Sequence, residues 1–118
     1  MASNVIFFSW QRSIPGREMV SAEHFTQFVG WMSSLKNSGT ITSFDPVFLT
    51  PGAGSSVNGF FLIQGDSQKL HELTETNEWL EHITRASLHL ENMGVTFGGT
   101  GPEVATRMQL WTKSIPTK

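Results

Sequence analysis

The chain of 118 residues contains neither cysteine nor tyrosine. Without cysteine there can be no disulfide bond, no thiolate nucleophile, and no zinc or iron–sulfur site with cysteine ligands. The missing thiols fit a reducing compartment, so we expect a cytoplasmic protein. Without tyrosine, no phenol is available to act as an acid in an active site.

Charge of either sign is also scarce. Charged residues make up 15% of the chain, and the formal net charge is -2. Nucleic-acid binding requires clustered lysine and arginine, so DNA and RNA are not expected partners. The first apolar run has no basic segment before it and is too short for a signal-peptide core or a membrane span. No Asn-x-Ser/Thr sequon occurs, so we expect neither secretion nor membrane insertion.

Apolar residues are plentiful by contrast, at 38% of the chain, with 11% aromatic residues. A chain of this length can bury roughly two thirds of the surface of its unfolded state. It can therefore form a core without disulfide or metal cross-links. We expect one domain over residues 1–118.

The first half alternates between strand and helix patterns. Apolar alternation predicts strands, and apolar spacings of three and four predict a helix. The expected strands are Asn4–Trp10, Thr40–Thr50 and Gly59–Gln64, and the expected helix is Met19–Lys36. Pro46 lacks an amide donor, which favours an edge position for the second strand. A flexible loop is expected at residues 51–56.

The second half repeats the helix-then-strand order. Asp66 is a candidate N-cap for a helical stripe formed by Leu70, Leu73, Leu80 and Ile83. The polar residues 74–77 are expected to divide this stripe into two helices. A fourth strand is predicted at Leu88–Phe97, and a final helix begins near Pro102. The apolar residues of that last helix need a surface to cover them.

The element order is therefore β-α-β-β-α-β with an extra C-terminal helix. This order predicts a ferredoxin-like α+β fold, with both helices on one face of a four-stranded antiparallel sheet. The other face would be bare and lined by large residues such as phenylalanine and tryptophan. A small domain rarely exposes so large an apolar surface, so we expect a homodimer in which two sheets pack together.

The chain also resembles a known superfamily. The first strand followed by Ile14-Pro15-Gly16-Arg17-Glu18, the segment Gly59-Phe60-Phe61-Leu62-Ile63-Gln64-Gly65-Asp66, and Glu78-Trp79-Leu80 are similar to the dimeric α+β barrel proteins. These include antibiotic-biosynthesis monooxygenase-like and YCII-like proteins, and the motifs look most like uncharacterised bacterial members. The resemblance implies a homodimer with a cleft between sheet and helices. Members differ in chemistry, so it implies no particular activity.

Two residues are the first candidates for acid–base chemistry. His89 and Glu91 are two apart on the predicted fourth strand, so they would project from the same face as a base and an orienting carboxylate. The alternative is a structural pair near the sheet edge. Ser9 and His24 are further candidates for a ligand cleft, although a lone histidine on a helix is more often a boundary residue.

Other patterns lead to no site. His71, Glu75, Glu78 and His82 follow helical spacings and carry metal-compatible groups, but the expected break and the flanking core make a solvated border the better interpretation. No metal site is predicted.

The glycine-rich segments do not indicate a cofactor either. Gly52-Ala53-Gly54 precedes a strand and not a helix, and Gly98-Gly99-Thr100-Gly101 lacks a lysine partner. The four tryptophans are interpreted as packing residues, so no cofactor is predicted.

Three functions remain open. The first is a homodimer that binds a small apolar or aromatic molecule in each subunit. The second is a cofactor-independent monooxygenase or isomerase, in which His89 or His24 accepts a proton from an aromatic or quinone-like substrate. The third is a structural or regulatory dimer without a pocket. The sequence does not decide whether the protein is an enzyme.

Overall fold

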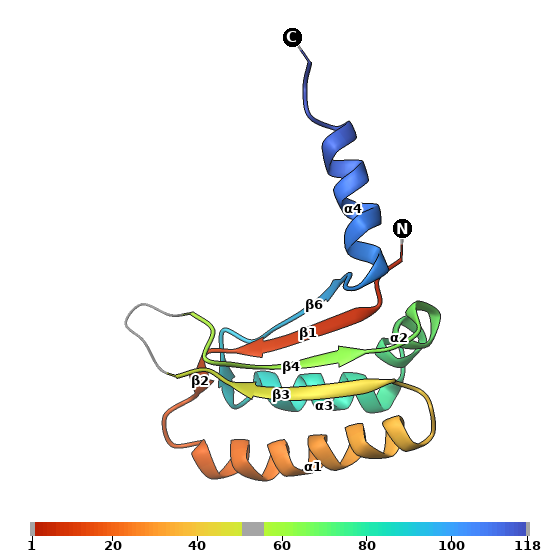
Figure 1. The fold of residues 1–118 in the computed structure, drawn as a ribbon. Helices are drawn as coiled ribbons and strands as arrows, with labels where there is room; N and C mark the ends of the chain where they lie inside the picture. Colours follow the sequence, from red (N-terminus) through yellow and green to blue (C-terminus); the bar gives the residue numbers. More distant parts are fainter. Residues whose placement is uncertain (1, 51–55, 118) are drawn as a thin grey trace.

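The computed structural model describes residues 2–50 and 56–117. Its main sheet is antiparallel with the strand order β3-β4-β1-β6 (Figure 1). The strands are β1 (Val5–Trp10), β3 (Ser43–Phe48), β4 (Gly59–Gln64) and β6 (Gly94–Gly98). The first strand is central. Pro46 lies on an edge strand, as predicted. The ferredoxin-like α+β fold is thereby confirmed.

The helices of the two crossovers lie on one side of this sheet (Figure 1). They are α1 (Glu18–Asn37), α2 (Ser67–Thr74) and α3 (Asn77–Ser87). The predicted division into two helices is confirmed, and each has a side-chain cap. The Asp66 carboxylate accepts from the amide of Lys69, and the Thr76 hydroxyl accepts from the amide of Trp79. Each cap satisfies an amide that the first helical turn leaves without a partner.

The core fills the space between the helices and the sheet. Every second residue of the two central strands points into it, as the pleat requires. These residues are Ile6, Phe8, Trp10, Phe61 and Ile63. Gly59 lies directly beneath the Trp10 ring, and a Cβ atom added to it would be 2.6 Å from Cζ2 of that ring. Only glycine allows Trp10 to lie so close to β4.

The predicted fourth strand is wrong in its first half. Helix α3 ends at Ser87, and the amide of His89 still donates to the carbonyl of Ala86. A short strand β5 (Leu90–Glu91) then pairs with β2 (Arg12–Ser13) in a separate two-stranded ribbon. Asn92 has a φ of 51° and interrupts the extended backbone before β6 begins.

Several side chains also lie elsewhere than expected. Leu80 is 53% exposed, because the buried face of α3 is formed by Trp79 and Ala86. Trp10 points to the helix side of the sheet, so it does not line the bare face. The strand predicted at Thr40–Thr50 is shorter at both ends. The Gly52-Ala53-Gly54 segment of the predicted loop lies outside the described residues.

Two apolar surfaces have no cover within the described chain. The open sheet face carries the partly exposed residues Phe7, Val47, Phe60 and Leu62, as the pairing register shows. Helix α4 (Pro102–Lys113) projects away from the sheet (Figure 1). The exposed apolar residues of the C-terminal segment are Val104, Met108, Leu110, Trp111 and Ile115. None of the described helices has the length and apolar character needed to cross a membrane.

Candidate functional site

A pocket of about 500 Å³ lies between the sheet and helix α1. Its apolar wall consists of the aromatic side chains Phe8, Trp10, Phe25, Phe28, Phe48 and Phe61. The rings contact one another, with centroid separations of 4.9 Å for Phe28–Phe61 and 5.3 Å for Phe25–Phe61. Phe48 is 69% exposed and lies at the mouth. The volume is in the range that small-molecule sites occupy.

One edge of the pocket is polar. The lining residues there are Ser13, Glu18, Ser21, His24 and His89. The hydroxyl of Ser13 lies 2.7 Å from that of Ser21, which in turn lies 2.7 Å from Nδ1 of His89. Nε2 of His89 is 2.8 Å from Nδ1 of His24. The aromatic pocket therefore ends on a continuous row of hydrogen bonds.

This row continues beyond the pocket. Nε2 of His24 lies 2.9 Å from Nδ1 of His82, on α3. The His82 ring is stacked on Trp31, with a centroid separation of 4.7 Å and an interplanar angle of 15°. Ser21, His89, His24 and His82 together form what we call the imidazole chain. It runs from the pocket between α1 and α3.

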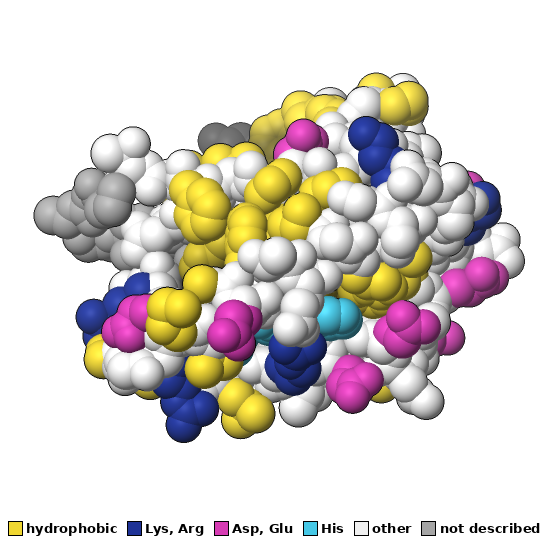
Figure 2. Space-filling view, turned by 90° about the horizontal axis from the view of Figure 1, so that it is seen from below, with side chains coloured by type: hydrophobic (Ala, Val, Ile, Leu, Met, Phe, Trp, Pro, Cys, Tyr) yellow, Lys and Arg dark blue, Asp and Glu magenta, His cyan; other side chains and the backbone are white. Residues whose placement is uncertain are grey.

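The outer end of the imidazole chain reaches solvent. Among the described residues, the only fully buried side-chain nitrogen or oxygen without a hydrogen-bond partner is Nε of Arg107. Nε2 of His82 has no hydrogen-bond partner among the described residues. Because it is not one of the fully buried atoms without a partner, it is in contact with solvent. Figure 2 views the helix face and shows histidine side chains at the surface among acidic and basic ones.

Two local structures position His89. Its amide is bonded to the end of α3, and its carbonyl accepts from the amide of Ile14 at 2.8 Å. The guanidinium of Arg17 donates to the neighbouring Leu88 carbonyl at 3.1 Å. The β2–β5 ribbon and the start of α1 therefore hold the His89 ring against Ser21.

The surroundings keep these histidines neutral. Burial lowers the pKa of His24 to about 4, and the Arg85 charge and the two neighbouring imidazoles act in the same direction. Burial followed by Arg85 also lowers the pKa of His82 and of His89. A neutral imidazole both donates and accepts a hydrogen bond, so the imidazole chain can pass a proton without carrying a charge at rest.

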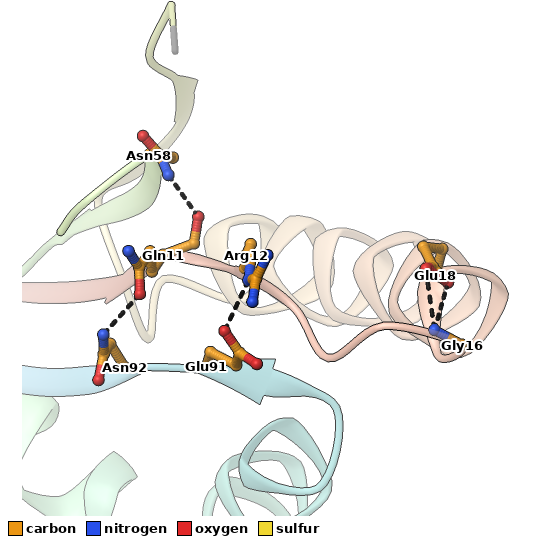
Figure 3. A network of polar contacts seen from close by, with 7 residues as sticks. All are labelled: Gln11, Arg12, Gly16, Glu18, Asn58, Glu91 and Asn92. Atoms are coloured by element: carbon orange, nitrogen blue, oxygen red, sulfur yellow. Dashed lines mark hydrogen bonds and ion pairs between the residues drawn. The ribbon is translucent and has the colours of Figure 1, made fainter. Parts of the chain in front are cut away.

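The pairing expected of His89 and Glu91 does not form. Both nitrogens of the His89 ring are bonded to other side chains, and Glu91 forms an ion pair with Arg12, with Nε and Oε2 2.6 Å apart (Figure 3). The reason is that the last turn of α3 still holds His89 through its amide, whereas Glu91 belongs to β5. Glu91 is outside the pocket lining.

Of the two residues predicted to line a ligand cleft, one lines the pocket and the other does not. Ser9 alternates with Phe8 and Trp10 and lies on the open face of the sheet, so it does not line the pocket. His24 does line it, and it is only 4% exposed, which differs from the boundary position expected of it.

The histidine and glutamate stripe, which the sequence does not predict to be a metal site, is also divided. Thr76 and the end of α2 separate His71 and Glu75 from His82, which turns inward to His24. Within the described residues, no group of three or more potential ligands is arranged to hold a metal ion. In the imidazole chain each ring nitrogen between two histidines is occupied by its neighbour, so the rings do not converge on a common point.

Sequence reasoning missed Ser13 and Ser21 and gave His82 the wrong surroundings. A signal was present for two of them. Ser21 precedes His24 by three positions and Phe25 by four, so it shares their helix face. His82 follows Trp79 by three and precedes Ala86 by four, which places it on the buried face of α3.

Comparisons with known proteins show the fold. No family model matches the chain, and no curated protein matches it. Among solved structures, a dimeric protein of unknown function with a ferredoxin-like fold, from Bacteroides fragilis, is similar with a TM-score of 0.53 and 11% identity. The alignment covers 81% of this chain and 95% of that one. At this identity the similarity shows that the chain has the ferredoxin-like fold.

Proposed function

We propose that this protein binds a small aromatic molecule in the pocket between α1 and the sheet. The observation that carries the proposal is the pairing of an aromatic wall with a polar edge. Such a site stacks on the flat part of a ligand and fixes its orientation through one polar group. The structural alternative assumed a dimer without a pocket, so the presence of this pocket makes that alternative less well supported.

The lining also narrows the ligand chemistry. Glu18 is the one charged side chain among the described residues that line the pocket. Its carboxylate accepts from the Gly16 amide at 2.9 Å, and this bond lowers the pKa of Glu18 (Figure 3). No lysine or arginine is among the described residues that line the pocket, so a carboxylate at its edge disfavours anionic ligands. We therefore favour a neutral ligand with a hydroxyl group, such as a phenol or naphthol, over an aromatic acid.

A thermal-shift screen tests this proposal. Phenols, naphthols, quinones, aromatic acids and haem are compared, and a neutral hydroxyl-bearing aromatic is expected to raise Tm most. At ten times Kd, a ligand stabilises the folded state by about 1.4 kcal/mol. This corresponds to about 5 °C for a domain of this size.

Two tryptophan variants provide the control. Ala22 lines the pocket, whereas Glu23, next to it on α1, does not. Ala22→Trp should fill the pocket and remove the shift, and Glu23→Trp should retain it. Equal shifts in the two variants, or no shift with any compound, would reject the pocket as a binding site.

A second candidate is a cofactor-independent monooxygenase or isomerase. It is favoured by the contact of Ser21 with His89 at the pocket edge, where a neutral imidazole can accept a proton from a substrate. Compounds that raise Tm are incubated with the protein and followed for oxygen uptake and for isomerised product. Compounds recovered unchanged would leave binding as the function.

We also propose that the protein is a homodimer of the dimeric α+β barrel type. The open sheet face carries partly exposed apolar side chains, helix α4 carries exposed ones, and the similar Bacteroides fragilis protein is dimeric. Packing two open faces together would cover Phe7 and Phe60 of each copy, and α4, which projects away from the sheet (Figure 1), would pack beside the partner.

Sedimentation velocity at micromolar concentration tests the dimer. The wild-type chain should sediment as a dimer, and Phe60→Glu should be a monomer because a charge would be buried between the sheets. Leu80→Glu is the matched control, since Leu80 is an exposed apolar residue on the helix side. A monomeric wild type, or dissociation by Leu80→Glu alone, would contradict this interface.

A further inference from the structure

We propose that the imidazole chain conducts a proton from the pocket to solvent at His82. The source of the proton depends on the proposed function, because it is the bound molecule. The path of the proton depends only on the geometry of the imidazole chain. Three consecutive contacts of 2.7, 2.8 and 2.9 Å join Ser21 to His82 through His89 and His24. All three are within hydrogen-bonding distance, so each is a step that a proton can take.

The connectivity restricts the three neutral rings to two states. A neutral imidazole carries one N–H, and each contact between two rings needs one donor and one acceptor. If His24 carries its proton on Nε2, it donates to His82 and must accept from His89, so all three rings are protonated on Nε2. If His24 carries its proton on Nδ1, all three are protonated on Nδ1. Any combination of Nδ1 and Nε2 tautomers among the three rings leaves at least one ring–ring contact with no proton or with two protons.

The charges around the chain favour the Nε2 state. Arg17 acts on His89 at the pocket end, whereas Glu78 and Glu81 act on His82 at the outer end. The Ser13 hydroxyl donates to Ser21, which directs the Ser21 hydroxyl at Nδ1 of His89, and the two carboxylates attract protons toward the outer end, so the N–H bonds point outward. Arg85 lies on α3 between the two ends and disfavours a positive charge on all three rings.

Proton transfer then follows in one direction. The hydroxyl of a bound molecule gives its proton to Ser21 Oγ, which gives its own to Nδ1 of His89. The Nε2 proton of His89 passes to Nδ1 of His24, and that of His24 to Nδ1 of His82. The Nε2 proton of His82 leaves to water. Three Nδ1–H bonds form and three Nε2–H bonds break. The oxyanion left in the pocket accepts a hydrogen bond from the Ser21 hydroxyl, which now carries the ligand's proton, and one more proton is in solvent.

The tautomers of the free protein test the path directly. The chain contains four histidines, and the fourth, His71, bonds to the Ser67 carbonyl on α2, outside the imidazole chain. Nitrogen-15 correlation spectra of the full-length protein report which ring nitrogen carries each proton. Near neutral pH, His24, His82 and His89 should all be Nε2 tautomers.

Acidification should then switch the whole chain. A proton bound by His82 occupies both of its nitrogens, so His24 and His89 must move their protons to Nδ1. The His89 signals should therefore change with the same midpoint as His82, although His82 lies two rings away. In His24→Gln, which keeps an amide for hydrogen bonding but cannot relay, the His89 response should be lost. His82→Gln should also remove the switch, and His71→Gln should leave it unchanged.

Two results would overturn the proposal. One is a mixture of Nδ1 and Nε2 tautomers among the three rings at neutral pH. The other is a His89 transition that persists in both His24→Gln and His82→Gln. These spectra need no ligand. They can therefore reject the proton path while the thermal-shift screen still shows binding in the pocket, and the screen can reject binding while the spectra still support the path.

Discussion

Acidification from about pH 7 to about pH 4 should lower the free energy of unfolding by about 3 kcal/mol through His24 alone. This side chain is 4% exposed, and its pKa in the folded protein is about 4, compared with 6.5 for an unperturbed histidine. Each pKa unit corresponds to about 1.4 kcal/mol. The loss is a large part of the roughly 5–15 kcal/mol that stabilises an ordinary domain.

The sign follows from which state binds the proton first. As the pH falls through 6.5, the unfolded chain protonates His24 while the folded chain does not, because burial and Arg85 oppose the charge. The unfolded state therefore gains stability from about pH 6.5 down to about pH 4, and the folded state retains its full advantage above this window. The lowered pKa values of His82 and His89 act in the same direction.

Urea unfolding at fixed protein concentration across this pH range measures the effect. In His24→Gln the titrating group is absent, so stability should depend much less on pH, although some stability is lost at neutral pH. His71→Gln removes an exposed histidine and should keep the wild-type profile. If the wild type is as stable at the acid end as at neutral pH, or if His24→Gln has the same slope, His24 is not buried as a neutral group.

The order of elements could be predicted because it depends on local patterns. Alternating apolar residues in β1 and β4, and the capping carboxylate of Asp66, act over a few residues and leave a visible trace in the sequence. The prediction failed at Leu88–Phe97, where the apolar alternation continued through a helix end. There, the positive φ of Asn92 and the pairing of β5 with β2 determine the structure.

The candidate site could be predicted only in part, because its contacts join distant segments. His24 is 58 residues from His82 and 65 from His89, and Ser21 is 68 from His89. Spacing along one helix can place a histidine on a face, but it cannot show that α1 and α3 bring the three histidine rings together. The same limit explains Glu91: its real partner, Arg12, is 79 residues away.

Phe61→Ala should lower the free energy of unfolding by about 3–5 kcal/mol. Phe61 is buried at the centre of the aromatic wall, and its ring contacts those of Phe8, Trp10, Phe25 and Phe28. Removing the ring leaves a cavity that the two central strands cannot close, because the sheet hydrogen bonds fix their positions. Phe61→Leu, which retains much of the volume, should lose far less.

Phe60→Ala is the matched control, because Phe60 is the preceding residue on β4 and points to the open face of the sheet. The two variants should separate the two proposed surfaces. Phe61→Ala should abolish ligand-dependent stabilisation while the protein still sediments as a dimer, since the open face is unchanged. Phe60→Ala should weaken the dimer and leave the ligand response intact. If both variants alter the same property, pocket and interface are not on opposite faces of the sheet in the assembled protein.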